Sequence, residues 1–116
     1  MKILFIVNDP PYGTERCFNA LRLALALLKE EQKPEITLFL MADAVLCAKT
    51  GQKTPDGYYN LGQMIKGVAR QAEVVLCGTC LDARGIDDSE LIAGASRGTM
   101  PLLAQFTLAS DRVLVF

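Results

Sequence analysis

Two cysteines three residues apart, Cys77 and Cys80, form the one pair in the chain whose type and spacing suggest covalent chemistry. The thiolate is the reactive form of cysteine, and the backbone donors of a loop together with Arg84 would favour it over the thiol. A second thiol at this spacing can attack a mixed disulfide or a persulfide on Cys77, which releases reduced sulfur and leaves a disulfide. Because cysteine is also among the most buried residue types, packing at the end of a strand is the alternative interpretation.

Other cysteine chemistries fit the sequence less well. Thioredoxin-type exchange uses the same spacing but places it at a helix N-terminus, whereas Gly78-Thr79 predicts a loop rich in turn residues. The chain has no histidine, which excludes Ser-His and Cys-His catalysis and removes the commonest zinc ligand. Zinc would need four ligands drawn from distant cysteines or carboxylates, so we predict no metal site. Cys17 and Cys47 have apolar neighbours and are assigned to the core.

The composition argues against several kinds of partner. The 12 basic and 13 acidic residues are spread without a basic run, so we expect neither nucleic acid nor an anionic membrane as a partner. No glycine pattern matches a phosphate-binding loop, and no cofactor is predicted. The hydrophobic fraction of 51% is high for one domain of 116 residues, which indicates self-association.

Two apolar segments bear on the location of the protein. The segment 3–7 is too short for a secretory signal, and the segment 23–28 is too short to cross a bilayer. We therefore expect a cytoplasmic protein, in which the cysteines are thiols.

The hydrophobic pattern predicts alternating strands and helices. Strands are expected at 3–7, 36–41, 73–77 and 113–116, with a brief one at 92–96, and helices at 14–32, 44–49, 60–72 and after 99. Thr14, Asp43 and Thr99 have the side chains of helix N-caps. The alternation, without any two-residue hairpin signal, predicts a single α/β domain over residues 1–116, with a parallel sheet covered by helices on both faces.

Two of these segments have further implications. The helix at 14–32 has an apolar stripe wider than one sheet requires, so it is either covered by neighbouring elements or in contact with a second subunit. The turn-rich segment 50–57 is expected to form a mobile loop that could cover a site.

The candidate binding residues follow the first three predicted strands. Ligands of open parallel sheets bind beyond the carboxyl ends of the strands, where the loops converge. Besides the two cysteines, we expect the crevice there to include Asn8, Tyr12, Glu15, Asp43, Asp82 and Arg84. Isolated acids beside turns are more often caps, so no carboxylate is predicted to be a catalyst.

Motifs along the whole chain resemble one known family. They are Asn8 with 11–15 (PYGTE), 38–45 (LFLMADAV), 51–53 (GQK), 57–58 (GY), 77–86 (CGTCLDARGI) and 107–114 (TLASDRVL). In this order they resemble the DsrE/DsrF-like family of small sulfur-handling proteins, and most closely its YchN-type branch.

The resemblance implies both a fold and a function. It implies a three-layer α/β/α sandwich with a five-stranded, mainly parallel sheet, and a homo-oligomer that is a trimer or a hexamer of two trimers. In similar sulfur-relay members a cysteine carries persulfide sulfur between partner proteins, and an arginine followed by glycine stands seven residues beyond it. Cys77, Arg84 and Gly85 match that spacing.

The resulting expectation is a sulfur relay or sulfur-binding protein that acts through Cys77, with Cys80 as the resolving thiol and with donor or acceptor proteins as partners. The persulfide carriers mostly have a small apolar residue where this chain has Cys80, and a vicinal thiol would tend to discharge a persulfide. Two alternatives stay open: a non-enzymatic oligomeric module that binds a ligand or partner, and a thiol–disulfide redox protein.

Overall fold

The computed structural model describes residues 1–116 and contains one five-stranded sheet in which all neighbouring strands are parallel. The strands are β1 (Lys2–Val7), β2 (Glu35–Leu40), β3 (Glu73–Cys77), β4 (Ala95–Gly98) and β5 (Arg112–Val115), and their order across the sheet is β4-β3-β2-β1-β5. The predicted fold class, an α/β sandwich with a five-stranded parallel sheet, is confirmed.

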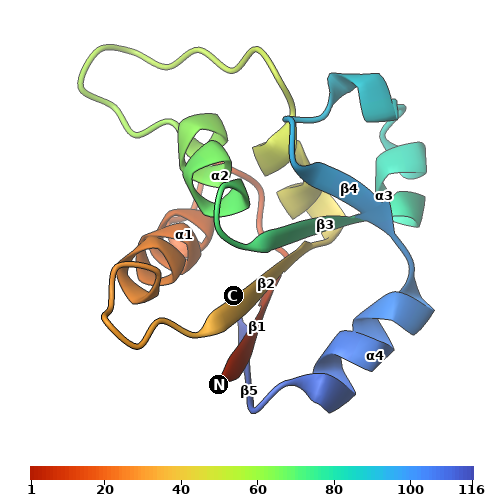
Figure 1. Ribbon diagram of the computed structural model, residues 1–116. Helices are drawn as coiled ribbons and strands as arrows, with labels where there is room; N and C mark the ends of the chain where they lie inside the picture. Colours follow the sequence, from red (N-terminus) through yellow and green to blue (C-terminus); the bar gives the residue numbers. More distant parts are fainter.

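Helices cover both faces of this sheet (Figure 1). α1 (Arg16–Leu27) and α2 (Leu61–Ala69) lie on one face, and α4 (Met100–Ala109) lies on the other. Side chains of a strand alternate between the faces, so Ile3 and Phe5 of β1 belong to the large core under α1 and α2, whereas Leu4 belongs to the small core under α4. The sheet therefore has one thickly covered face and one thinly covered face.

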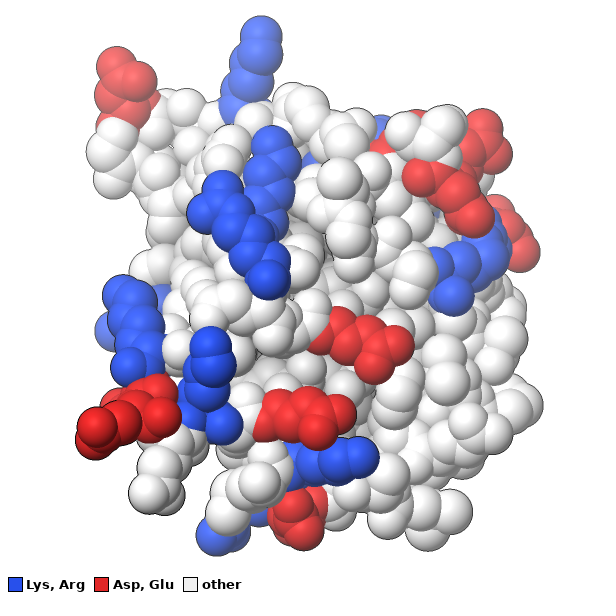
Figure 2. Space-filling model, in the orientation of Figure 1, with Lys and Arg blue, Asp and Glu red and all other residues white.

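α4 is the least buried of the helices that cover the sheet. Leu103 is its one buried residue, and Leu108 is 89% exposed. The segment from Thr99 to Ser110 has no charged residue. Figure 2 accordingly shows an area free of charged side chains over α4, at the lower right of the molecule. None of the helices is both long and apolar enough to span a membrane.

Some helix boundaries differ from the prediction. α1 extends from Arg16 to Leu27 and not over 14–32. The predicted cap at Thr14 is wrong: Glu15 is the N-cap, and the hydroxyl of Thr14 donates a hydrogen bond to Asp9 (2.7 Å) in the preceding loop. The predicted cap at Asp43 is wrong: the 3-10 helix η1 (Ala42–Ala48) has Met41 as its N-cap, and Asp43 lies in its first turn.

Two side chains cap helices in the structure, Asn60 and Thr99, and of these Thr99 was predicted as a cap. The side chain of Asn60 accepts a hydrogen bond from the N–H of Gln63 (3.1 Å) at the start of α2. Thr99 accepts one from the N–H of Leu102 (3.3 Å) at the start of α4.

The fourth strand was expected at 92–96 but lies at 95–98. Leu91 and Ile92 are buried, yet they pair with the end of η1: Leu91 forms a bridge with Lys49, and the N–H of Ile92 donates to the carbonyl of Ala48 (2.8 Å). β4 itself is an edge strand with the sequence ASRG, in which Gly98 is the one buried residue. A sequence this polar has no hydrophobic signal for a strand.

Candidate functional site

Cys77 is the last residue of β3 and also the N-cap of a short helix, α3 (Gly78–Ala83). The N–H of Cys80 donates a hydrogen bond to the sulfur of Cys77 (3.4 Å), and Leu81 anchors the helix in the core. The predicted loop after Cys77 is therefore wrong: the Cys77 sulfur accepts the N–H of Cys80, one of the N–H groups in the first turn that have no partner within the helix. The cysteine pair begins a helix, as in thioredoxin-type motifs.

Gly78 makes the sharp transition from β3 to α3 possible. A Cβ atom at this position would lie 3.1 Å from the Arg97 side chain and 3.1 Å from the carbonyl oxygen of Gly98. β4 thus approaches the start of α3 too closely for a larger residue.

The sulfur of Cys80 accepts a hydrogen bond from a strained part of the backbone. The N–H of Ala42 donates to it at 3.2 Å. Ala42 has a φ of 51° and is the only residue other than glycine with a positive φ, a conformation that costs about 1–2 kcal/mol. Burial and the hydrogen bond with Cys77 raise the pKa of the Cys80 thiol, and the Ala42 N–H and the charge of Arg84 oppose that rise. Cys80 is therefore mainly protonated at neutral pH.

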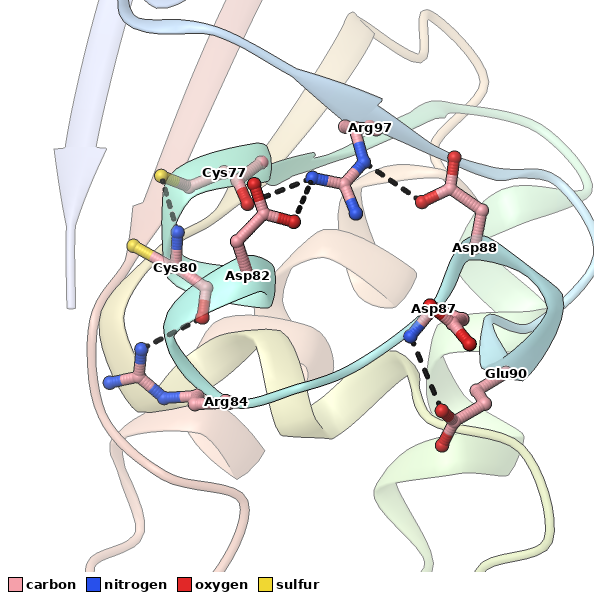
Figure 3. A network of polar contacts seen from close by, with 9 residues as sticks. Cys77, Cys80, Asp82, Arg84, Asp87, Asp88, Glu90 and Arg97 are labelled. Carbon is pink, nitrogen blue, oxygen red and sulfur yellow. Dashed lines mark hydrogen bonds and ion pairs between the residues drawn. The ribbon is translucent and has the colours of Figure 1, made fainter.

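Both cysteines line a cavity of about 820 Å³ at the carboxyl end of the sheet. Cys77 is only 9% exposed, and Cys80 is half-buried. The lining comes from the end of β2, the start of α3 and the turn from β4 into α4: Met41, Cys77, Gly78, Thr79, Cys80, Asp82, Arg97, Gly98, Thr99, Met100 and Pro101. Figure 3 shows the two sulfur atoms on the same side of α3.

Arg84 holds α3 against η1. Its Nε and Nη2 atoms bind Asp43 Oδ1 at 2.9 and 2.8 Å, and its Nη1 donates to the carbonyl of Cys80 at 2.9 Å. Its predicted partner was the anionic sulfur, but the guanidinium contacts the Asp43 carboxylate and the carbonyl of Cys80, the second of which Figure 3 shows. Neither Arg84 nor Asp43 lines the cavity.

Arg97 is a cavity residue that the sequence analysis missed. From β4 it donates to the carbonyl of Gly78 and to Asp82 (both 2.9 Å) and to Asp88 (2.8 Å), as Figure 3 shows. The hydrogen bonds with Asp88 and then Asp82 raise the pKa of Arg97. Arg97 lies 15 residues after Asp82 in the sequence, beyond any local pattern, and the misplaced fourth strand ended before it.

Three predicted binding residues lie elsewhere. Asn8 donates to the carbonyl of Phe116 (3.3 Å) at the end of β1. The hydroxyl of Tyr12 donates to the carbonyl of Tyr59 (3.3 Å), and Glu15 is the exposed N-cap of α1. None of the three lines the cavity, so of the six predicted binding residues only Asp82 shares it with the cysteines.

The segment 50–57, expected to cover a site, also stays away from this cavity. Gln52 holds it to η1 by donating from Nε2 to the carbonyls of Cys47 and Lys49, both at 2.8 Å. The next residues, Tyr58 and Tyr59, stack on each other with ring centroids 4.6 Å apart.

Cys17 and Cys47 are core residues, as predicted. Their sulfur atoms lie 3.6 Å apart, and the Cys17 thiol donates to the carbonyl of Asp9 (2.7 Å). The hydrogen bond to Cys17 and burial strongly raise the pKa of Cys47, which makes Cys47 a poor nucleophile.

Comparisons with known proteins identify similar chains. The model of the DsrE/DsrF-like family matches residues 1–116. Protein YchN of Escherichia coli (strain K12) is 47% identical over 116 residues, with 99% of this chain and 98% of that protein covered. Sulfurtransferase TusD of Pectobacterium atrosepticum is 31% identical over 124 residues, with 96% and 95% covered.

Solved structures agree with this. The crystal structure of the YchN protein from E. coli superposes with a TM-score of 0.93 at 47% identity, and 99% of this chain and 98% of that chain are covered. The protein of unknown function MTH1491 from Methanobacterium thermoautotrophicum shares the fold, with a TM-score of 0.77 at 12% identity and 97% of each chain covered.

Proposed function

The chain belongs to the DsrE/DsrF-like family, as its motifs predicted, and on this basis we propose that it accepts sulfane sulfur on Cys77 and that Cys80 is the resolving thiol. A relative that is 31% identical is a sulfurtransferase, TusD. The observation that supports the proposal most is the placement of both thiols on one cavity, with the backbone N–H of Cys80 donating to the sulfur of Cys77.

The proposed reaction has two steps. The thiolate of Cys77 attacks the outer sulfur of a persulfide donor, a bond to that sulfur forms, the donor's S–S bond breaks, and the donor leaves as a thiolate. Cys80, as a thiolate, then attacks the inner sulfur of the Cys77 persulfide and expels hydrosulfide. The two cysteines are oxidised to a disulfide and the transferred sulfur is reduced, so the electrons balance within the step.

The surroundings of the two sulfurs favour this division of roles. Cys77 is the N-cap of α3, and its sulfur accepts a hydrogen bond from the N–H of Cys80. The pKa of Cys80 is raised by burial and by Cys77, so Cys80 is the poorer nucleophile at neutral pH. A persulfide on Cys77 would consequently have time to meet an acceptor protein before Cys80 discharges it.

The test is treatment of the reduced protein with a persulfide donor, followed by intact mass spectrometry. We expect either a gain of one sulfur atom or a loss of two hydrogens, both absent in Cys77→Ser. Cys80→Ser should keep the added sulfur longer than the wild type. Met64→Leu, on α2 and outside the cavity, is the matched control. An adduct that persists in Cys77→Ser would refute the assignment of the acceptor.

A second candidate is thiol–disulfide exchange, and the helix that begins at Gly78 favours it. This function is one of the two alternatives left open by the sequence, where a loop expected after Cys77 argued against it; the observed helix removes that argument. Reduction of a model disulfide by the dithiol protein, lost in Cys77→Ser, would support it. A loaded persulfide that reaches an acceptor without any Cys77–Cys80 disulfide would argue for the relay instead.

The proposal also includes a homo-oligomer, a trimer or a hexamer of two trimers. The support is the exposed apolar side chains of α4, a helix without charged residues, and of β5: Met100, Leu108, Val113 and Val115. Exposed apolar surface of this kind marks interaction sites in soluble proteins when its side chains form one patch. α1 leaves less apolar surface for a subunit contact, because part of its apolar stripe packs against α2. Light scattering should show an oligomer for the wild type and a smaller species for Leu108→Glu.

A further inference from the structure

Sulfur-containing side chains are concentrated around the cavity beside Cys77. The chain has four cysteines and four methionines, and four of these eight are among the eleven cavity residues: Met41, Cys77, Cys80 and Met100. They come from four separate places in the fold, namely the residue after β2, the end of β3, α3 and the start of α4. We propose that this cavity binds a single copper(I) ion, with Cys77 and Cys80 as thiolate ligands and the two methionines as thioether ligands.

The ligand types select this metal. Thiolate and thioether sulfurs are soft ligands, which prefer Cu(I) among the common biological cations. The chain has no histidine, and no three Cys, Asp or Glu residues gather closely enough to hold a metal. A structural zinc site needs four nitrogen, sulfur or carboxylate ligands and is not available here. Cu(I) is satisfied by two thiolates, and thioethers can raise its coordination number.

The two methionines of the cavity differ in exposure. Met41 is half-buried and packs against the small core under α4. Met100 is 58% exposed at the first turn of α4, where its flexible side chain has room to change rotamer. The sulfur atoms of the two cysteines lie on the same side of α3 (Figure 3). The proposed site would therefore use one half-buried and one mobile thioether.

The charge balance is also favourable. Two thiols release two protons, two copper–sulfur bonds form, and copper stays in the +1 state, so the complex has one negative charge. The N–H groups of Cys80 and Ala42 donate to the two sulfurs, and Arg84 lies behind them. Such outer contacts orient thiolates and typically change metal affinity by about 10–100-fold.

Copper binding and sulfur transfer can be tested separately, because the copper titration contains no sulfur donor. The two would compete, since a thiolate bound to copper cannot attack a persulfide. One of them can therefore fail in experiment while the other holds.

The experiment is an anoxic titration of the reduced full-length protein with Cu(I) against a chromophoric Cu(I) chelator, with copper X-ray absorption to count sulfur neighbours. Loss of an outer contact alone changes metal affinity by about 10–100-fold, so we expect one Cu(I) per chain, a loss of more than about 100-fold in Cys80→Ser, which removes a thiolate ligand, and of at least about tenfold in the Met41→Leu/Met100→Leu double variant. Leucine conserves the volume of methionine, so the fold should be kept, and circular dichroism checks this. Met64→Leu should bind like the wild type.

Three results would overturn the proposal. The first is tighter binding of Zn(II) than of Cu(I). The second is unchanged Cu(I) affinity in the double methionine variant, which would show that the methionines are not ligands and that the two thiols alone bind the ion. The third is loss of copper in Cys17→Ala but not in Cys80→Ser, which would place the ion at the buried Cys17–Cys47 pair.

Discussion

Gly98 is the position at which a single added methyl group should do most damage to the site. It is the buried end of β4 and lies opposite Cys77 in the sheet. A Cβ atom on Gly98 would collide with Cγ1 of Val75, and it would also lie 3.4 Å from Leu102 and 3.5 Å from Phe39. Val75 is buried and β-branched, so it cannot rotate away. β4 would have to move away from β3.

The size of the effect follows from this overpacking. Extra methyl groups in a tightly packed core cost about 1–3 kcal/mol. For a chain of 116 residues each kcal/mol lowers Tm by about 3–5 °C. Because Arg97 precedes Gly98 and holds Gly78 and Asp82, a displaced β4 should also loosen the start of α3 and slow the loading of Cys77.

The assay compares urea unfolding of Gly98→Ala with that of the wild type, and persulfide loading of Cys77 is measured on both proteins. The matched control is Gly67→Ala in α2, where the new Cβ would lie 3.3 Å from a leucine methyl and alanine is the better helix former. The control should be neutral or more stable by up to about 1 kcal/mol. If Gly98→Ala unfolds at the same urea concentration as the wild type, the close packing of β3 and β4 described above is wrong.

Three further predictions concern single groups. Release of hydrosulfide requires the thiolate of Cys80, and the pKa of this thiol is raised. The rate of hydrosulfide release, measured with a sulfide electrode, should therefore keep increasing with pH beyond the ordinary cysteine pKa of about 8.5. A rate that is already constant near pH 7 would contradict this. Arg84→Gln removes a half-exposed ion pair with Asp43 and should lower the free energy of unfolding in urea by about 1 kcal/mol. It also removes a positive charge that lowers the pKa of Cys80, so alkylation of Cys80 at pH 8 should become slower. An unchanged alkylation rate would show that the charge of Arg84 does not affect the thiol. Thr99→Ala removes the N-cap of α4 and should cost about 1 kcal/mol in thermal unfolding, whereas Thr107→Ala, inside the same helix, should cost less.

The central strands could be predicted because the signal for them, a run of apolar residues, lies within each short segment. β1, β2 and β3 are runs of apolar residues covered on both faces, and the predicted 73–77 coincides with β3. β4 has no such run, since it lies at an edge and buries one residue. Its position depends on pairing with β3, which is a long-range contact that no short pattern contains.

The same reasoning explains which parts of the site were found. Cys77 and Cys80 stand out by their spacing within one segment, and the structure places them where β3 ends, on the cavity. α3 was missed because its first turn is capped by a cysteine sulfur, which is not among the usual capping groups. Arg97 was missed because its partners come from α3 and from a short 3-10 helix, η2 (Asp88–Glu90), both distant from it in the sequence.

The 3-10 helix η1 links the two cysteine pairs of the molecule mechanically. It has seven residues, and 3-10 runs longer than three or four are uncommon because their hydrogen bonds are poorly aligned. Contacts at its two ends must then hold it: the Ala42 N–H on the Cys80 sulfur at one end, and Cys47 against Cys17 at the other. A change in packing around Cys47 should therefore displace η1 and with it the Ala42 N–H that donates to the Cys80 sulfur. A changed alkylation rate of Cys80 in a Cys47→Ala variant would reveal this displacement.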